Sequence, residues 1–502
     1  MNINPGRVLM ATAVGIAAVA AVIALAAPPV WVAVLVGLVV ALVPLLSFSG
    51  ATLPQWIARA RAVSTPLTPQ RVVVRDGAAT VHHGSEVSAW LELSTPEPFA
   101  VTVVDPDGKV ALPEISPEDL RPLMVQDDIV LTSMEFITLG QRSLGRGRVA
   151  AAISQAAGKT DWPVDGRSFI KLTLDKNRSY AAVVARAPQG DVTIGAAKAI
   201  LAAAARTRIK CESLGYAARI LSPEQVERVS GEAVLLSEGD PSWSGIDTEN
   251  YRTEFFTVPV DSERSADWLS LPVSRVYTNM TLALDDGERP QVFETVGLVI
   301  PKHMSISDQV RGLPLKSLGG QHQQALSHVI PLAGDMPLSA STSEVAEARG
   351  VYAGGIGVLL GNTGKDRLFL RVHPGSGETM HCIGSSVIAR WLVQRLAQQA
   401  VSINVKLADP AWEKLVETVN SPLLRYMSVE PADIVVAEAG TARAGVVSSQ
   451  TVIGVAETAP PLPAQVSVVQ TGAGELTVTT ADNEWAVPWQ LTASEKSALG
   501  LD

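Results

Sequence analysis

The chain has 502 residues, of which 47% are hydrophobic and 18% are charged, and its net charge is −10. Residues 1–75 hold five arginines and no acidic residue, so residues 76–502 carry a net charge of −15. Phosphate binding needs a basic surface, and a body this acidic therefore argues against nucleic acid as a partner. The two cysteines, Cys211 and Cys382, are too few for a disulfide scaffold or a CxxC zinc site.

Two long apolar runs lie near the N-terminus, Val8–Ala27 and Val30–Phe48, joined by Pro28–Pro29. At 1.5 Å per residue, each run spans about 30 Å, the thickness of a bilayer core. The pattern predicts a transmembrane helical hairpin within residues 1–52, followed by a membrane-surface linker over residues 53–69. The lipid bilayer is therefore the first expected partner.

The arginines around this hairpin predict its orientation. Arg7 precedes it, and Arg59 and Arg61 follow it, with no charged residue between Arg7 and Arg59. Basic residues stay on the cytoplasmic side, so both termini and the main body are expected in the cytoplasm, at the inner membrane. The alternative is a cleaved signal peptide, which would leave Val30–Phe48 as a single anchor.

The body, from residue 70 onward, predicts a mixed α/β fold. Its first half, residues 70–350, includes a β-rich insertion. The expected strands are Val72–Arg75, Val87–Leu93, Phe99–Val104, Ser168–Leu174, Tyr180–Arg186, Tyr216–Leu221, Tyr251–Val258, Val273–Leu284 and Gln291–Ile300. Helices are expected over Asp191–Ser213, from the capping sequence at Ser116, and from the capping box at Ser222.

The second half, residues 351–459, repeats the same order of elements. A hairpin, a helix, a strand and a proline-capped helix are expected in turn, at Gly355–Leu360 with Arg367–Val372, Ile383–Ala400, Val401–Leu407 and Asp409–Val419. This order predicts two related halves, followed by a C-terminal tail over residues 460–502.

Several short motifs resemble nucleotide-binding, metal-binding or catalytic patterns but do not match them fully. The glycine-rich stretch 354–361 lacks the third glycine of a dinucleotide fingerprint and leads into a strand. Asp105 and Asp107 resemble a metal-binding pair, but their DPDG context favours a solvated turn. The remaining candidates, at spacings that match no zinc or triad pattern, are His82, His83, His373, His381 and Cys382. We therefore expect no catalytic, cofactor-binding or metal site.

The connection over residues 301–350 is too long for a plain link, and long connections commonly have a binding role. Its candidate partner-docking residues are Leu313, Leu315, Leu318, Gln321 and Leu326. The alternative is that these leucines pack on their own domain.

The chain resembles EccE, a membrane component of type VII (ESX) secretion systems. The resemblance rests on the hairpin at 8–48, the Tyr251-Arg252 strand leading to Trp268, and Leu318-Gly319-Gly320-Gln321 followed by Ala325-Leu326. Gly357-Val358-Leu359-Leu360-Gly361 with the strand Leu368–Val372 is similar too. The order of these motifs carries the resemblance more than any one of them.

This resemblance implies a two-span, non-enzymatic structural subunit of the inner-membrane secretion complex. It implies a place at the periphery of a ring with the EccB, EccC and EccD components, where the EccC ATPase drives protein export. It carries over no catalytic residue and no cofactor. The alternative function is a membrane-anchored enzyme acting on lipid-linked or nucleotide-sugar substrates.

The arginine flanks predict that reporter fusions at residue 2 and at residue 80 both give a cytoplasmic signal. Cytoplasmic and periplasmic reporters fused at each position measure this directly. A periplasmic signal at residue 80, or a mature N-terminus near residue 28, would contradict the predicted orientation.

Overall fold

The protein is described by a computed structural model. It covers residues 47–48, 51–52, 63, 67, 70–95, 99–110, 114–141, 152, 155–158, 160, 165–234, 239–258, 268, 271, 273–284, 290–302, 304–336, 338, 343–344, 350–372, 378–399, 401–430, 432–440, 450–461 and 463–501. The run Val8–Ala27, nearly all of Val30–Phe48, and Arg7, Arg59 and Arg61 lie outside these residues. Ser47–Phe48 (β1) pairs antiparallel with Ala51–Thr52 (β2), so the expected second helix does not extend to Phe48. Within the residues covered, no helix is both long and apolar enough to cross a membrane.

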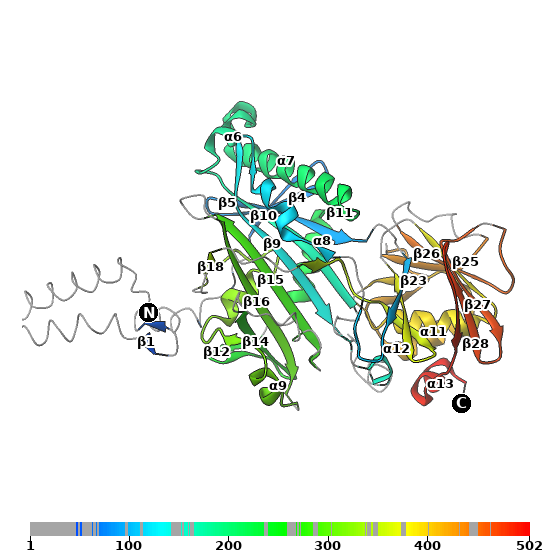
Figure 1. Ribbon diagram of the computed structural model, residues 1–502. Helices are drawn as coiled ribbons and strands as arrows, with labels where there is room; N and C mark the ends of the chain where they lie inside the picture. Colours follow the sequence, from blue (N-terminus) through cyan, green and yellow to red (C-terminus); the bar gives the residue numbers. More distant parts are fainter. Residues whose placement is uncertain are drawn as a thin grey trace, which may run out of the picture.

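The first unit is built on a large, antiparallel sheet (Figure 1). Its main strand order is β12-β13-β14-β16-β15-β9-β10-β5-β4-β3, and β8, β11, β17 and β18 pair at its margins. In chain order these strands are β3 (Arg71–Arg75), β4 (Ala78–His83), β5 (Glu86–Ser94), β8 (Val125–Gln126), β9 (Ile129–Gln141), β10 (Asp165–Asp175), β11 (Ala217–Ile220), β12 (Asp240–Ser242), β13 (Gly245–Asp247), β14 (Tyr251–Val258), β15 (Arg275–Leu284), β16 (Pro290–Pro301), β17 (Lys316–Ser317) and β18 (Ser343–Glu344).

Helices cover one face of this sheet. The long helix α7 (Val192–Ser213) packs on β4, β5, β9 and β10, and α6 (Tyr180–Ala185) lies beside it. The Asp191 carboxylate caps α7 by accepting hydrogen bonds from the amides of Thr193 (2.9 Å) and Ile194 (3.2 Å). At the crossing of the two helices, a Cβ on Gly195 would lie 2.2 Å from the Val183 carbonyl oxygen, so only glycine fits there. The remaining short elements nearby are α4 (Pro117–Leu120), η1 (Arg121–Met124), η2 (Pro188–Gly190) and α8 (Pro223–Val234).

The opposite face is covered by the connection that follows β16. Its helices are α9 (Ser307–Arg311) and α10 (His322–Ser327). Leu318, Gln321 and Leu326 are 2%, 2% and 0% exposed, and the two leucines pack with Trp90, Phe169, Phe255 and Tyr277. Leu313 and Leu315 are half-buried against a neighbouring cluster of the same unit. This placement corrects the docking prediction for the buried three, because a partner could not touch them without unfolding the segment.

The second unit contains an eight-stranded sheet in the order β24-β23-β25-β26-β22-β27-β28-β29. The strands from β24 to β27 are parallel, and β28 and β29 are antiparallel. The strands are β22 (Thr379–Ile383), β23 (Ile403–Val405), β24 (Leu424–Tyr426), β25 (Ile434–Glu438), β26 (Thr451–Ala456), β27 (Val466–Gly472), β28 (Glu475–Thr479) and β29 (Glu484–Pro488), and the helices are α11 (Ser386–Leu396), α12 (Pro410–Val419) and α13 (Ala493–Leu499). Residues 460–502, expected as a separate tail, thus supply three strands and a helix to this unit.

The two units are joined by a small sheet and by an ion pair. The hairpin of β20 (Val358–Thr363) and β21 (Asp366–Val372) pairs with β6 (Phe99–Val104), and β19 (Val351–Tyr352) pairs with β7 (Glu114–Ile115). Arg228 of α8 contacts the Asp433 carboxylate at 2.6 Å, across 205 residues of chain. The chain therefore crosses between units at more than one place.

The structure confirms the mixed α/β class and most of the predicted elements. It corrects one of them, because Tyr180–Arg186 is the helix α6 rather than a strand. A short apolar run does not distinguish strand from helix, which explains this error. The helix expected over Ile383–Ala400 is present as α11, Ser386–Leu396, and Ile383 itself is the last residue of the strand β22. The two expected related halves also have different topologies, antiparallel in the first and mostly parallel in the second.

We expect Leu326→Ala to lower the stability of the first unit by about 2–5 kcal/mol, because it opens a cavity in a closed core. Thermal and denaturant unfolding of the full chain in detergent measure this. Leu315→Ala, at a half-buried position, is the matched control and should have the smaller effect. Loss of a partner with unchanged stability in Leu326→Ala would restore the docking interpretation.

Candidate functional site

A row of polar side chains crosses the sheet face that α10 covers. Glu135 of β9 pairs in register with Lys171 of β10, and Lys171 pairs on its other side with Trp90 of β5. Thr281 of β15 lies opposite Glu135. Side chains alternate along a strand, so the neighbours Met134, Phe136, Ile170 and Leu172 point into the opposite core, against α7. This alternation therefore places Glu135 and Lys171 on the sheet face that α10 covers.

Lys171 lies between two carboxylates. Its Nζ is 3.0 Å from Glu135 Oε1 and also donates to Asp335 Oδ2. Asn279 Nδ2 donates to the other Glu135 oxygen, Oε2, at 2.7 Å. The side chains of Lys171 and Glu135 are only 4% and 2% exposed. Both charges are thus buried, and each is paired.

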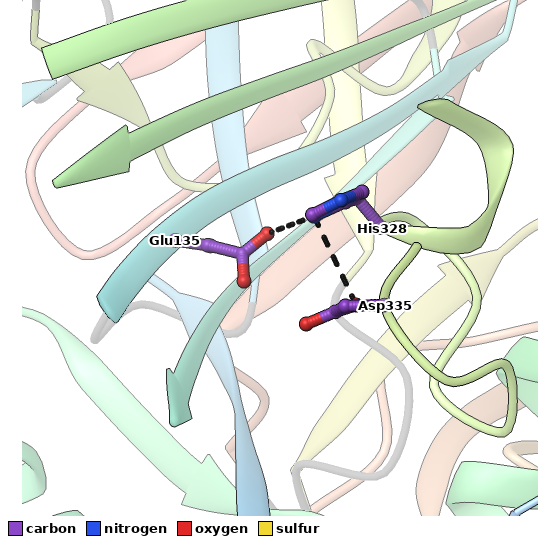
Figure 2. Close-up of side chains that lie close together, drawn as sticks. All are labelled: Glu135, His328 and Asp335. Carbon is purple, nitrogen blue, oxygen red and sulfur yellow. Dashed lines mark hydrogen bonds and ion pairs between the residues drawn. The ribbon is translucent and has the colours of Figure 1, made fainter. Parts of the chain in front are cut away.

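His328 completes the group, and we call Glu135, Lys171, His328 and Asp335 the ion cluster. Figure 2 shows three of these side chains, Glu135, His328 and Asp335, pointing toward one another. His328 Nδ1 is 3.3 Å from Glu135 Oε2 and 3.8 Å from Asp335 Oδ1, and Nε2 is 3.0 Å from the Met336 carbonyl oxygen. A carbonyl and an ionised carboxylate both only accept hydrogen bonds. Both ring nitrogens must therefore carry hydrogen, which makes His328 an imidazolium and balances two positive against two negative charges.

The electrostatics agree with this assignment. Burial alone would raise the pKa of Glu135, but the Lys171 charge and the His328 contact hold it well below its usual range. Burial alone would lower the pKa of Lys171, yet Asp335 and Glu135 raise it above its usual range. The pKa of His328 is likewise raised, because Asp335 and Glu135 outweigh its burial. These directions favour the charged forms of Glu135, Lys171 and His328 near neutral pH.

His322, six residues earlier, has the opposite protonation state. Its Nδ1 accepts from the Phe255 amide at 2.9 Å, and Nε2 faces the Trp243 carbonyl at 3.2 Å. This pairing needs a neutral ring with hydrogen on Nε2. Burial lowers the pKa of His322 to about 4, consistent with that geometry.

Glu135, His328 and Asp335 have the chemistry of a metal site, because their ligand atoms lie within 4.8 Å of one another. Carboxylates and imidazole are common ligands of divalent metals. Here, however, the Lys171 ammonium contacts both carboxylates, and both His328 nitrogens donate hydrogen bonds. The position of the cation is thus filled by the protein's own lysine, and the residues do not fit a metal ion while Lys171 is charged.

The sequence-predicted candidates do not converge on one place. Asp105 accepts a hydrogen bond from the Lys109 amide at 2.8 Å and closes the expected turn. His82 is buried beside Thr80, at 3.1 Å, and burial with nearby Lys176 and Arg71 lowers its pKa to about 4. His381 is buried within β22, and burial raises the pKa of the adjacent Cys382 thiol to about 12. His373 lies outside the described residues.

Sequence reasoning missed the ion cluster entirely. One signal was present, since Glu135 is the only charged residue of β9, and Lys171 interrupts the apolar middle of β10 between Ile170 and Leu172. Lone charges of this kind are buried only when paired. The partners could not be read from the sequence, because His328 and Asp335 lie more than 150 residues beyond Lys171.

No protein-family model matches the chain, and no curated protein matches it either. The site must therefore be interpreted from its own geometry.

We expect Lys171→Met to destabilise the first unit by about 3–5 kcal/mol, because it leaves the carboxylates of Glu135 and Asp335 with only the His328 imidazolium to balance two negative charges. Denaturant unfolding measures the loss. Lys198→Met, on the outer side of α7, is the control and should be near neutral. Adding Glu135→Gln and Asp335→Asn to Lys171→Met should recover part of the stability, and no recovery would contradict charge imbalance as the cause.

The ion cluster also predicts a pH dependence. His328 has a folded pKa above its unfolded value of about 6.5, so its stabilising contribution is full below that value. The contribution is lost as pH rises through the folded pKa. The difference in unfolding free energy between wild type and His328→Gln should therefore shrink as the pH rises above about 6.5. A difference that grows over this window would contradict the imidazolium assignment.

Proposed function

We propose that this chain is a non-enzymatic structural subunit of an inner-membrane type VII secretion complex. The observation that carries the proposal is the pair of uncharged apolar runs at 8–48, flanked by arginines and followed by a body of net charge −15. Together with an order of motifs that resembles that of EccE, this favours an anchored cytosolic body. The body would act by holding its place beside the EccB, EccC and EccD components.

The chemistry of the described residues supports a structural role. The ion cluster is neutralised internally, and its side chains are only 2–18% exposed. General acid-base catalysis needs a group that can reach a substrate, and groups this deeply placed and paired with one another are poorly suited to that. The ion pairs of Lys171 with Asp335 and of Glu135 with His328 instead hold the segment 328–336 against the sheet.

The alternative, an enzyme for lipid-linked or nucleotide-sugar substrates, would need a carboxylate pair open to a metal and a diphosphate. Asp105 and Asp107 are the nearest match in sequence. The Asp105 carboxylate is engaged by the Lys109 amide within its own turn. We therefore rank this function second.

Co-purification tests the proposal. An affinity-tagged full chain, extracted from membranes in mild detergent, should bring down EccB, EccC and EccD in fixed proportions. The untagged strain is the control for non-specific capture. A chain that is recovered alone from membranes, with the other three assembled without it, would contradict the proposed role.

A structural role also predicts that Asp105→Ala, Asp107→Ala and His381→Ala leave secretion near wild type wherever the variant protein accumulates normally. Immunoblots of secreted substrate against variant abundance measure this. Lost secretion with an intact complex in Asp105→Ala or Asp107→Ala would favour the enzymatic alternative.

A further inference from the structure

The helical layer of the first unit has an unusual surface. Ten large apolar side chains are exposed in the described part of the chain, and five of them lie on α6, α7 and the adjoining β8. They are Val125, Tyr180, Val184, Val192 and Ile209, with exposures of 39–62%. Figure 1 shows α6 and α7 lying along one side of the large sheet, with no other described element drawn over them. Half of the exposed apolar groups thus gather on one outer surface.

The same layer is basic in an acidic protein. Residues 176–210 contain seven basic groups and one acidic group, a net charge of +6 against −10 for the whole chain. Three of the arginines have acidic partners, as Arg186 pairs with Asp128, Arg206 with Asp127, and Arg208 with Glu212. Lys198 and Lys210 have no ion pair within the described residues. The layer therefore keeps uncompensated positive charge beside its apolar side chains.

The chain also enters the body next to this layer. β3 begins at Arg71, is the edge strand of the sheet, and pairs with β4, on which α7 packs. Val72 packs in the opposite core, so alternation places Arg71 and Arg75 on the side of α7. Residues 53–70 can span at most about 60 Å when fully extended. If residues 8–48 lie in the bilayer, the layer is within reach of its surface.

We propose that the face formed by α6, α7 and β8 binds the surface of an anionic phospholipid bilayer, with the exposed Tyr180, Val184 and Ile209 as its apolar groups and the half-buried Lys198 and Lys210 as its basic groups. Basic residues beside exposed aromatic and aliphatic side chains are the composition of interfacial membrane-binding surfaces. The rest of the body is strongly acidic and is repelled by the same lipids. This asymmetry orients the body, with the basic layer toward the membrane. The inference rests on the membrane anchor of the proposed function.

A lipid-contact measurement on the full chain tests this inference. The natural cysteines, Cys211 and Cys382, are buried, so a thiol-reactive fluorophore will label a cysteine introduced by Tyr180→Cys or Ile209→Cys. Val429→Cys, at a position 98% exposed in the second unit, is the matched control. Each labelled chain is reconstituted in phosphatidylcholine bilayers with or without phosphatidylglycerol, and quenching by headgroup-proximal spin-labelled lipid is recorded.

We expect quenching at positions 180 and 209 only when phosphatidylglycerol is present, and none at position 429. Lys198→Gln and Lys210→Gln should each reduce the contact equilibrium about fivefold, because each basic group near an anionic surface contributes about that factor. Lys406→Gln, in the second unit, should change nothing. Added salt should weaken the contact by screening.

The experiment distinguishes failure of the lipid-binding surface from failure of the membrane anchor. A chain that stays in the bilayer after alkaline extraction but shows no quenching at 180 and 209 overturns the lipid-facing surface and leaves the anchor intact. A chain released by alkaline extraction overturns the anchor itself, and with it the proposed function. If the label at position 180 is not quenched, and position 180 cross-links to a protein subunit in cells, this face is a protein-docking surface instead.

Discussion

The first unit depends on the contacts of the Lys171 ammonium with two carboxylates, the buried Glu135 and the half-buried Asp335. Glu135 comes from the neighbouring strand and Asp335 from the segment that closes the sheet face. An isolated charge at this depth would be prohibitively unfavourable, so none of the three groups can be buried without the others. Asp335 and His328 belong to the segment 328–336, which covers the sheet face. This segment must therefore pack on the sheet before the charges of Glu135 and Lys171 are fully paired.

A buried ion cluster of this kind is a weak source of net stability, because desolvation offsets much of the attraction. Its stronger effect is on specificity. A slip of one residue between β9 and β10 would turn either Glu135 or Lys171 toward α7 and its alanine-rich core, and would leave the other without its partner. The cluster therefore fixes strand register and the position of the connection together. This explains why residues expected to dock a partner instead form part of the interior.

The sequence predicted the elements whose ends carry strong local signals. Asp409 and Pro410 marked the start of α12, which ends at Val419 as expected, and Asp191 marked the start of α7. It failed where signals were local but ambiguous, as at Tyr180–Arg186, which has an apolar run suited to strand or helix. It failed also where the answer depended on distant residues, since the partners of Glu135 and Lys171 come from strand pairing and from residues 328–335.

We conclude that the protein's own lysine closes the ion cluster, which serves structure rather than metal chemistry. This can be tested by titrating the purified full chain with Zn²⁺ and Mn²⁺ and comparing wild type with Glu135→Gln. We expect identical binding by the two proteins, and a gain of Glu135-dependent binding only in a folded Lys171→Met variant. Stoichiometric metal binding by wild type that is lost in Glu135→Gln would contradict it.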